Sequence, residues 1–342
     1  MIRVLVVDDS LTVRARLAEV IQAAPGFEVV GQAQDGQEAV EKCCALRPDV
    51  MTLDMALPRM TGVQATVEIM SRNPTPILIV SASTNRGDLL RTYDALAAGA
   101  VDVLEKPLAD AGDWEAELLA RLRLVARVRV ITHLRGRATR HQVPSRTPAL
   151  ETARSPSVVG IGASTGGPAA LQAILSALPA DFPLPLLIVL HIGAAFESAL
   201  PEWLQHHAAL PVRNARDGEP LPPRGVVLAP AGRHLRLRAG RLCYSDEPPR
   251  YSCKPSVDVL FESLAQELGA RAIGCLLTGM GRDGAAGLLT MRARGAQTAA
   301  QDEASSVVYG MPAEAARLGA AQAILPLAEV APWLVRKAQV LA

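Results

Sequence analysis

The stretch VVGIGASTGGP, residues 158–168, decides how the second half of this chain folds. An apolar run that fits a buried strand stops abruptly, small residues follow, and a helix-compatible stretch runs from Ala169 to Leu178. We therefore expect a strand, a tight turn that glycine permits, and a helix, with Ser164 at the apex. A hydroxyl at the carboxyl end of a strand lies where open α/β sheets carry out their chemistry.

Segments typical of strands and helices alternate on both sides of this stretch, which favours parallel sheets covered on both faces. A β-hairpin is expected at residues 235–238 and 241–244, where Ala239-Gly240 supplies the turn. The sequence thus predicts an α/β fold class with two doubly wound parallel-sheet domains. The expected strands are 2–7, 27–31, 50–53, 77–80, 101–104, 158–161, 186–190, 226–229, 273–278 and 297–300, and the expected helices of the first domain include 11–24, 37–46 and 114–130.

The alternation is interrupted between the two predicted domains. Prolines, Ser/Thr and a run of arginines replace the apolar periodicity there, which is typical of a flexible basic linker with solvated charges. The predicted division is a first domain over 1–125, a linker over 126–156 and a second domain over 157–342.

Composition narrows the class of protein. The chain has 342 residues and a formal net charge of +1, which gives no reason to expect nucleic acid as a partner. Five cysteines without regular spacing indicate reduced thiols and neither a disulfide framework nor a zinc site. Because no apolar run resembles a signal peptide or a membrane span, we expect a cytoplasmic protein without membrane insertion.

Acidic side chains follow the expected strands of the first domain. Asp8 and Asp9 end the first strand and Asp54 ends the third, so three carboxylates are expected at one sheet edge. Such a cluster is costly without a cation, and oxygen ligands suit Mg²⁺. Ser81 and Lys106 follow the fourth and fifth strands, and together the five residues suit transfer of a phosphoryl group to a carboxylate.

Residues 1–125 resemble a response-regulator receiver domain, on the motifs Val7-Asp8-Asp9-Ser10, Asp54 with Leu57-Pro58, Ser81, and Lys106-Pro107. The resemblance implies that Asp54 accepts the phosphoryl group, that Asp8, Asp9 and Asp54 hold Mg²⁺, and that a sensor histidine kinase is the donor. Receivers commonly carry an aromatic residue three positions before the lysine, and this chain has Val103 there. The route by which the signal leaves the domain is therefore left open.

Three functions compete for the glycine-rich turn. A dinucleotide fingerprint needs glycine where Thr165 stands and an acid at the end of the next strand, where His191 stands. A phosphate loop needs a lysine that does not follow Gly166-Gly167. The remaining interpretation is a G-x-S-x-G serine nucleophile, with His191 on the same sheet edge as its general base.

A serine–histidine pair needs a carboxylate that orients the imidazole. Asp283 follows the expected strand 273–278 in a glycine-rich turn, and it is favoured over Asp258, Asp217 and Asp302. The predicted order of Ser164, His191 and Asp283 along the chain differs from that of α/β-hydrolases, which indicates another lineage of serine hydrolases.

Residues 157–342 resemble the catalytic domain of the chemotaxis protein-glutamate methylesterase family. The motifs are GASTGGP from residue 162, DGE from 217, APAGRHL from 229, PSVDVLF from 255, LTGMGRDGA from 277, and QDE at 301–303 with GMP at 310–312. A receiver, a linker and this domain also follow one another in the family. Leu190-His191-Ile192 departs from the usual Gln-His-Met but keeps the histidine.

The resemblance implies hydrolysis of glutamate γ-methyl esters on methyl-accepting chemoreceptors, with release of methanol, and deamidation of certain receptor glutamines. The esterase reaction would need no cofactor, and backbone N–H groups near Thr165 and Met280 are the candidate oxyanion donors. We expect the resting receiver to cover the edge that carries Ser164 and phosphorylation of Asp54 to open it. Two alternatives stay open, a non-enzymatic regulator that only binds a partner and a serine hydrolase for another ester.

Overall fold

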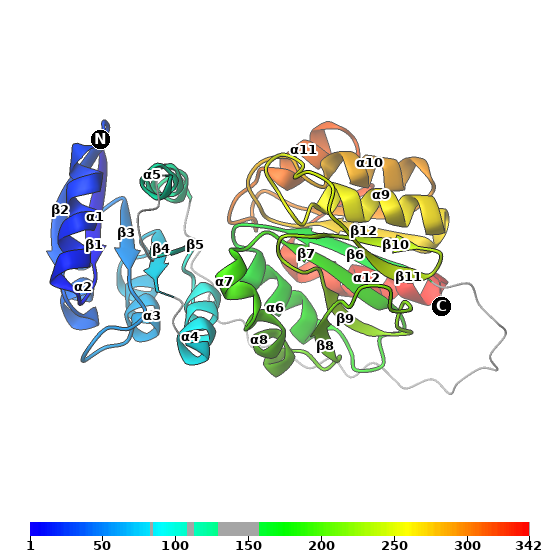
Figure 1. Ribbon diagram of the computed structural model, residues 1–342, viewed down its shortest axis with the longest axis horizontal. Helices are drawn as coiled ribbons and strands as arrows, with labels where there is room; N and C mark the ends of the chain where they lie inside the picture. The colour runs from blue at the N-terminus through cyan, green and yellow to red at the C-terminus, as the bar shows by residue number, and fades with distance from the viewer. Residues whose placement is uncertain (83–84, 108–112, 129–156, 342) are drawn as a thin grey trace.

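The computed structural model describes residues 1–82, 85–107, 113–128 and 157–341. Two parallel sheets with flanking helices form the protein, and Figure 1 shows them side by side. The predicted α/β fold class is confirmed. The predicted linker, 126–156, lies almost wholly outside the described residues, so the exact division of the chain stays a prediction.

The first sheet has the strand order β2-β1-β3-β4-β5, and each neighbouring pair is parallel. This order brings the carboxyl ends of β1 and β3 next to each other at the centre of the sheet. The strands are β1 Ile2–Val7, β2 Phe27–Ala33, β3 Val50–Leu53, β4 Ile77–Ser81 and β5 Asp102–Glu105, and the helices are α1 Leu11–Ala23, α2 Gly36–Leu46, α3 Gly62–Arg72, α4 Arg86–Ala97 and α5 Trp114–Val125.

The second sheet has the order β14-β13-β12-β6-β7-β9-β8, also parallel throughout, and a hairpin of β10 and β11 stands beside it. Its central strand is β6, which pairs with β12 and β7. The strands are β6 Val158–Ala163, β7 Pro185–Leu190, β8 Val212–Asn214, β9 Gly225–Leu228, β10 His234–Arg238, β11 Arg241–Ser245, β12 Ala272–Leu276, β13 Gln297–Gln301 and β14 Ala323–Leu325.

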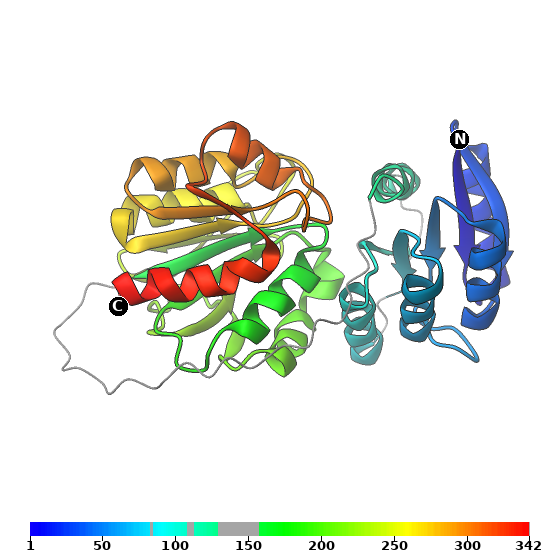
Figure 2. The same ribbon diagram turned by 180° about the vertical axis from the view of Figure 1, so that it is seen from behind.

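Helices cover both faces of this sheet, which buries its apolar strands. Figure 2 shows α6 and α12 on one face, while α9, α10 and α11 lie on the other. The helices are α6 Gly167–Ala177, α7 Ala194–Glu197, α8 Leu200–His207, α9 Val257–Leu268, the 3-10 helix η1 Gly269–Arg271, α10 Ala285–Ala293, α11 Met311–Arg317 and α12 Leu327–Leu341. Among the described residues, no helix is long and apolar enough to span a membrane.

The glycines of the deciding stretch have two different roles. A Cβ at Gly160 would lie 2.6 Å from Leu264 Cδ1, and one at Gly162 would lie 2.3 Å from Val257 Cγ1. Both therefore allow α9 to pack closely against β6 and do not form the turn. The turn itself needs Gly166, whose φ of 77° lies in the left-handed region that favours glycine.

Most expected strands appear within two residues of their predicted ends, and the hairpin is confirmed. The strand predicted over 273–278 ends at Leu276, because Leu277 and Thr278 already belong to the loop that follows. The helix predicted over 114–130 ends at Val125. The short edge strands β8 and β14 were not predicted, since three residues carry too little periodicity to identify.

Helix α4 of the first unit packs on the second unit (Figures 1 and 2). The ring of Tyr93 stacks on Trp203 of α8 with centroids 5.1 Å apart. Tyr93 Oη donates to the carbonyl of Phe196 at 2.8 Å, and Trp203 Nε1 donates to Asp94 Oδ1 at 2.9 Å. Because Tyr93 and Trp203 are buried, this contact joins the two units through a buried aromatic core.

Candidate active site

Ser164 lies one residue beyond β6, at the turn into α6, as predicted. Its N–H donates to the carbonyl of Thr278 at 3.0 Å. The backbone of Gly279 also approaches it closely, since a Cβ on that glycine would lie 2.7 Å from the Cβ of Ser164. The loop after β12 therefore fixes the backbone of Ser164 from one side.

The turn leaves a limited choice of oxyanion donors. The N–H of Ser164 is used by Thr278, and the N–H of Gly167 donates to the carbonyl of Ser164 at 2.6 Å. Thr165 is buried within the turn, whereas Met280 is largely exposed at the rim. Both residues line the same cleft as Ser164.

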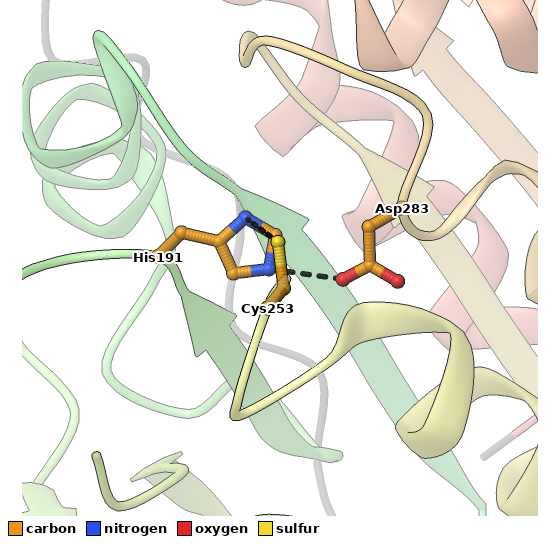
Figure 3. Close-up of side chains that lie close together, drawn as sticks. All are labelled: His191, Cys253 and Asp283. Carbon is orange, nitrogen blue, oxygen red and sulfur yellow. Dashed lines mark hydrogen bonds and ion pairs between the residues drawn. The ribbon is translucent and has the colours of Figure 1, made fainter. Parts of the chain in front are cut away.

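His191 follows β7 directly and lies beside the end of β6, because its N–H donates to the carbonyl of Ala163 at 3.0 Å. Its Nε2 lies 2.9 Å from Asp283 Oδ2 (Figure 3). Among the residues that the structure describes, no hydrogen bond joins Ser164 to His191. The two side chains share one cleft, and in a covered site such a bond is often longer than in the working complex.

Asp283 is buried and accepts several hydrogen bonds. The hydroxyl of Ser256 donates to Oδ1 at 2.7 Å, and the N–H groups of Val257 and Asp258 donate at 2.7 and 3.2 Å. These two N–H groups open α9, so the carboxylate lies at the positive end of that helix. Although burial acts to raise the pKa of Asp283, the bonds to His191 and Ser256 outweigh it and hold the pKa below its usual value.

The imidazole is biased toward its charged form. Burial disfavours the cation, but the contacts with Asp283 and Cys253 outweigh burial and raise the pKa of His191 to about 9. The fraction of neutral imidazole, which alone can accept a proton, therefore increases as the pH rises toward 9.

The competing carboxylates have other partners. Asp258 bonds the N–H of Gly287, Asp217 bonds that of Tyr244, and Asp302 bonds Ser305. Asp283 does not cap the helix that follows it, because Gly284 occupies the N-cap position of α10.

Cys253 is the residue of this site that the sequence did not reveal. Its Sγ lies 3.7 Å from His191 Nδ1, on the ring nitrogen opposite Asp283 (Figure 3). It lies in the loop before α9, outside any strand end, so its position in the sequence carries no signal of its proximity.

The acidic cluster of the first sheet is assembled as predicted at the edge formed by β1 and β3. Lys106 Nζ lies 2.7 Å from Asp8 Oδ2 and 3.2 Å from Asp54 Oδ2. Asp8 and Asp54 are buried, whereas Asp9 is exposed. Ser81 ends β4 and is linked to Lys106 through the backbone, where the lysine N–H donates to the serine carbonyl at 3.0 Å.

The charges of this cluster compensate one another. Burial raises the pKa of Asp8, and Lys106 opposes that shift. Burial acts to lower the pKa of Lys106, but the carboxylates of Asp54 and Asp8 outweigh it and raise that pKa. Ligand oxygens of Asp8, Asp9 and Asp54 lie within 4.8 Å of one another, a hard oxygen set that fits Mg²⁺.

The cleft that holds Ser164 is lined by both units and has a volume of about 540 Å³. From the first unit, Asp102 and Val103 of β5 and Arg121 of α5 line it. Arg121 ties the two elements together, because it bonds Asp102 Oδ2 at 3.0 Å and the carbonyl of Val103 at 2.9 Å. The β5–α5 face of the receiver-like unit thus covers the candidate active site.

Known proteins share both halves of this arrangement. A family model described as CheB methylesterase matches residues 159–334, and one described as response regulator receiver domain matches residues 4–117. The chain belongs to the CheB methylesterase family.

Relatives in the CheB family match this chain nearly end to end. A protein-glutamate methylesterase/protein-glutamine glutaminase 2 of Anaeromyxobacter dehalogenans is 47% identical over 332 residues, which cover 96% of this chain and 95% of the relative. A relative of the same name from Cupriavidus metallidurans is 43% identical, with 97% of each chain covered. The solved catalytic domain of Thermotoga maritima CheB is 34% identical with a TM-score of 0.52, and it covers 54% of this chain and 99% of the solved one.

CheB membership confirms the two resemblances on which the sequence interpretation rested. The comparisons identify the family without assigning a role to any single side chain. The roles of Ser164, His191, Asp283 and Asp54 therefore rest on the geometry above.

Proposed function

We propose that this chain is a phosphorylation-activated esterase, which hydrolyses glutamate γ-methyl esters on methyl-accepting chemoreceptors and deamidates glutamines of the same receptors. The observation that carries the proposal is the His191–Asp283 pair, 2.9 Å apart, whose histidine lines the same cleft as Ser164. The names of the relatives supply the substrate class.

Ser164 Oγ attacks the ester carbonyl while His191 accepts its proton. Because Asp283 occupies Nε2, the nitrogen left to accept that proton is Nδ1. The imidazolium then returns the proton to the departing methoxide, and methanol leaves an acyl-serine. Water attacks the acyl-serine by the same route and regenerates Ser164, with glutamate as the product. With a glutamine substrate, ammonia leaves in place of methanol.

The oxyanion of each tetrahedral intermediate needs backbone donors. The N–H of Thr165 is the stronger candidate, because it belongs to the residue directly after the proposed nucleophile, whereas the N–H groups of Ser164 and Gly167 are already bonded. Met280 at the rim is the second candidate. The loss of one such donor costs about 3–4 kcal/mol in other hydrolases.

Asp54 is the proposed phosphoryl acceptor, with a sensor histidine kinase as the donor. Asp8, Asp9 and Asp54 would hold Mg²⁺, which when bound neutralises charge on the phosphoryl oxygens. Lys106 contacts Asp54 and Asp8 directly and places a cation beside the same oxygens. Ser81, buried at the end of β4, places a hydroxyl at the same edge of the sheet as these carboxylates.

Regulation follows from the cover over the cleft. Val103 and Arg121 of the receiver unit line the space that a receptor side chain must enter. Phosphorylation of Asp54 would weaken the contact between the units and open the cleft. Because a sensor histidine kinase is the proposed phosphoryl donor, we also propose that the protein works in the cytoplasm.

Release of methanol from methylated receptor tests this function. Ser164→Ala is expected to lower the rate at least about 10³-fold with the fold intact. Ser176→Ala is the matched control, because that hydroxyl bonds the carbonyl of Gln172 on an exposed face of α6. An unchanged rate for Ser164→Ala would contradict the proposed nucleophile.

The same assay separates the alternatives. A wild-type protein that binds receptor but releases neither methanol nor ammonia would be a non-enzymatic regulator. One that hydrolyses only simple esters, through Ser164, would be a serine hydrolase with a different substrate.

A further inference from the structure

The imidazole of His191 has a sulfur neighbour that the esterase mechanism does not use. Cys253 Sγ lies 3.7 Å from Nδ1, while Asp283 Oδ2 lies 2.9 Å from Nε2 (Figure 3). A thiol and an imidazole nitrogen, both facing one cleft, form a pair of ligands for soft and borderline metal ions.

The spacing of the pair fits a tetrahedral ion. Zinc binds cysteine sulfur at about 2.3 Å and histidine nitrogen at about 2.0–2.1 Å. At a tetrahedral angle those bond lengths separate the two ligand atoms by about 3.6 Å. The 3.7 Å between Cys253 Sγ and His191 Nδ1 therefore accommodates zinc with little movement of either side chain.

The hydrogen-bond partners that orient a metal-binding histidine are also in place. Metal-binding histidines usually donate their second N–H to a carboxylate, which fixes the tautomer and orients the ring. Asp283 provides this carboxylate at Nε2, and it is itself held by the hydroxyl of Ser256 and the N–H of Val257. One ion cannot reach both ring nitrogens in the plane of the ring, so Asp283 orients the histidine and is not a ligand.

We propose that Cys253 and His191 form a binding site for a thiophilic divalent cation of the zinc class, with Sγ and Nδ1 as protein ligands and water in the other positions. Binding releases the thiol proton and, where the imidazole is protonated, the proton on Nδ1 as well, while Nε2 keeps its proton toward Asp283. The cleft of about 540 Å³ gives the ion a path to the pair. The all-oxygen cluster of Asp8, Asp9 and Asp54 differs in ligand type and favours Mg²⁺.

The ion would inhibit the esterase, a consequence that rests on the proposed function. It occupies Nδ1, the nitrogen that accepts the serine proton, and so removes the general base. The site thus makes the esterase sensitive to zinc through a residue outside the proposed catalytic set.

Cobalt(II) is a spectroscopic probe for this site, because it accepts the same ligands and absorbs when bound to thiolate. The full chain, reduced and in excess Mg²⁺ to fill the acidic cluster, is titrated with Co²⁺ and then with Zn²⁺. We expect a thiolate-to-cobalt charge-transfer band that reaches its full intensity at one equivalent of Co²⁺ and disappears when Zn²⁺ displaces the cobalt. Cys253→Ser and Cys253→Ala should abolish the band, whereas Cys243→Ser, which removes a thiol of hairpin strand β11, should keep it.

A missing band, or a band that survives both Cys253 variants, overturns the site whatever the activity. Methanol release then tests the consequence, with each variant compared with its own zinc-free rate. Zinc should inhibit wild type and Cys243→Ser reversibly, with recovery on chelation, and should inhibit Cys253→Ser at least tenfold less effectively. A band that follows Cys253 while zinc leaves the wild-type rate unchanged supports the site and contradicts His191 as the base.

Discussion

The two functional regions occupy the same position on their sheets, at the carboxyl ends of central parallel strands, yet they are prepared differently. In the acidic cluster, Lys106 contacts both Asp8 and Asp54, so the proposed acceptor already has its cation. At the proposed esterase site, His191 is paired with Asp283, whereas among the described residues the hydrogen bonds of Ser164 come from its backbone. The contacts of the first region are thus complete among its charged side chains, while the serine and histidine of the second are not yet joined.

The receiver unit limits access to the proposed esterase site. The β5–α5 face lines the cleft, and α4 holds that face in place through the Tyr93–Trp203 stack. We therefore propose that the receiver unit acts on the esterase by position, without supplying any group to the proposed chemistry.

The largest expected effect on activity comes from the His191–Asp283 pair of the esterase site. Asp283→Asn keeps the size of the side chain but removes the charge that orients His191, so kcat should fall about 10⁴-fold. Asp302→Asn is a matched control, because that carboxylate bonds Ser305 and not the histidine. Steady-state methanol release measures both variants, and similar losses in the two would contradict the assignment of Asp283.

The ionisation of His191 gives the next effect. Because its pKa is raised to about 9, most of the imidazole is protonated at pH 7 and half of it is neutral at pH 9. The value of kcat/KM should therefore rise about 50-fold between these pH values. A pH profile of the unphosphorylated protein measures this, and a profile that is flat above pH 7 would contradict the assigned base. In Asp283→Asn the rise should move to lower pH, because the carboxylate that raises the pKa is gone.

Strand ends made the main residues of both regions predictable from the sequence. Asp8, Asp9, Asp54, Ser81 and Lys106 each lie at or just after the end of a strand of a parallel sheet, and the topology brings such ends together. Ser164 and His191 were predictable for the same reason.

The contacts that no strand end signals were missed. Cys253 contacts His191 from an irregular loop. Tyr93 stacks on Trp203, which is 110 positions away in the sequence, and both lie on helix faces with the apolar pattern of an ordinary core. The packing role of Gly160 and Gly162 was missed as well, because a glycine that admits a neighbouring helix looks the same in a sequence as any other glycine.

A smaller effect is expected from the contact between α4 and α8, which we propose holds the β5–α5 face over the cleft. Trp203→Phe keeps the apolar ring but removes the hydrogen bond to Asp94, which is worth about 0.5–1.5 kcal/mol. The rate of the unphosphorylated protein should rise about 2- to 10-fold. Trp114→Phe is the control, since its indole donates to the carbonyl of Glu105 within the receiver unit. A rise in the control but not in Trp203→Phe would place the holding contact elsewhere.

The smallest effect is expected from the ion pair of Arg86 and Glu202 at the edge of the same contact. Both side chains are partly exposed, and such pairs contribute at most about 1 kcal/mol and are screened by salt. Arg86→Gln should therefore raise the unphosphorylated rate less than Trp203→Phe does, and added salt should remove the difference from wild type. A larger rise that persists at high salt would show that charge, and not the aromatic core, holds the cover.

Phosphorylation control is tested most directly by methanol release from the full chain with and without a small-molecule phosphoryl donor, in wild type and in Asp54→Asn. We expect that the donor raises the wild-type rate, that Asp54→Asn stays at the unphosphorylated rate, and that both proteins depend on Ser164. Equal wild-type rates with and without the donor, measured while Asp54 carries the phosphoryl group, would contradict phosphorylation control.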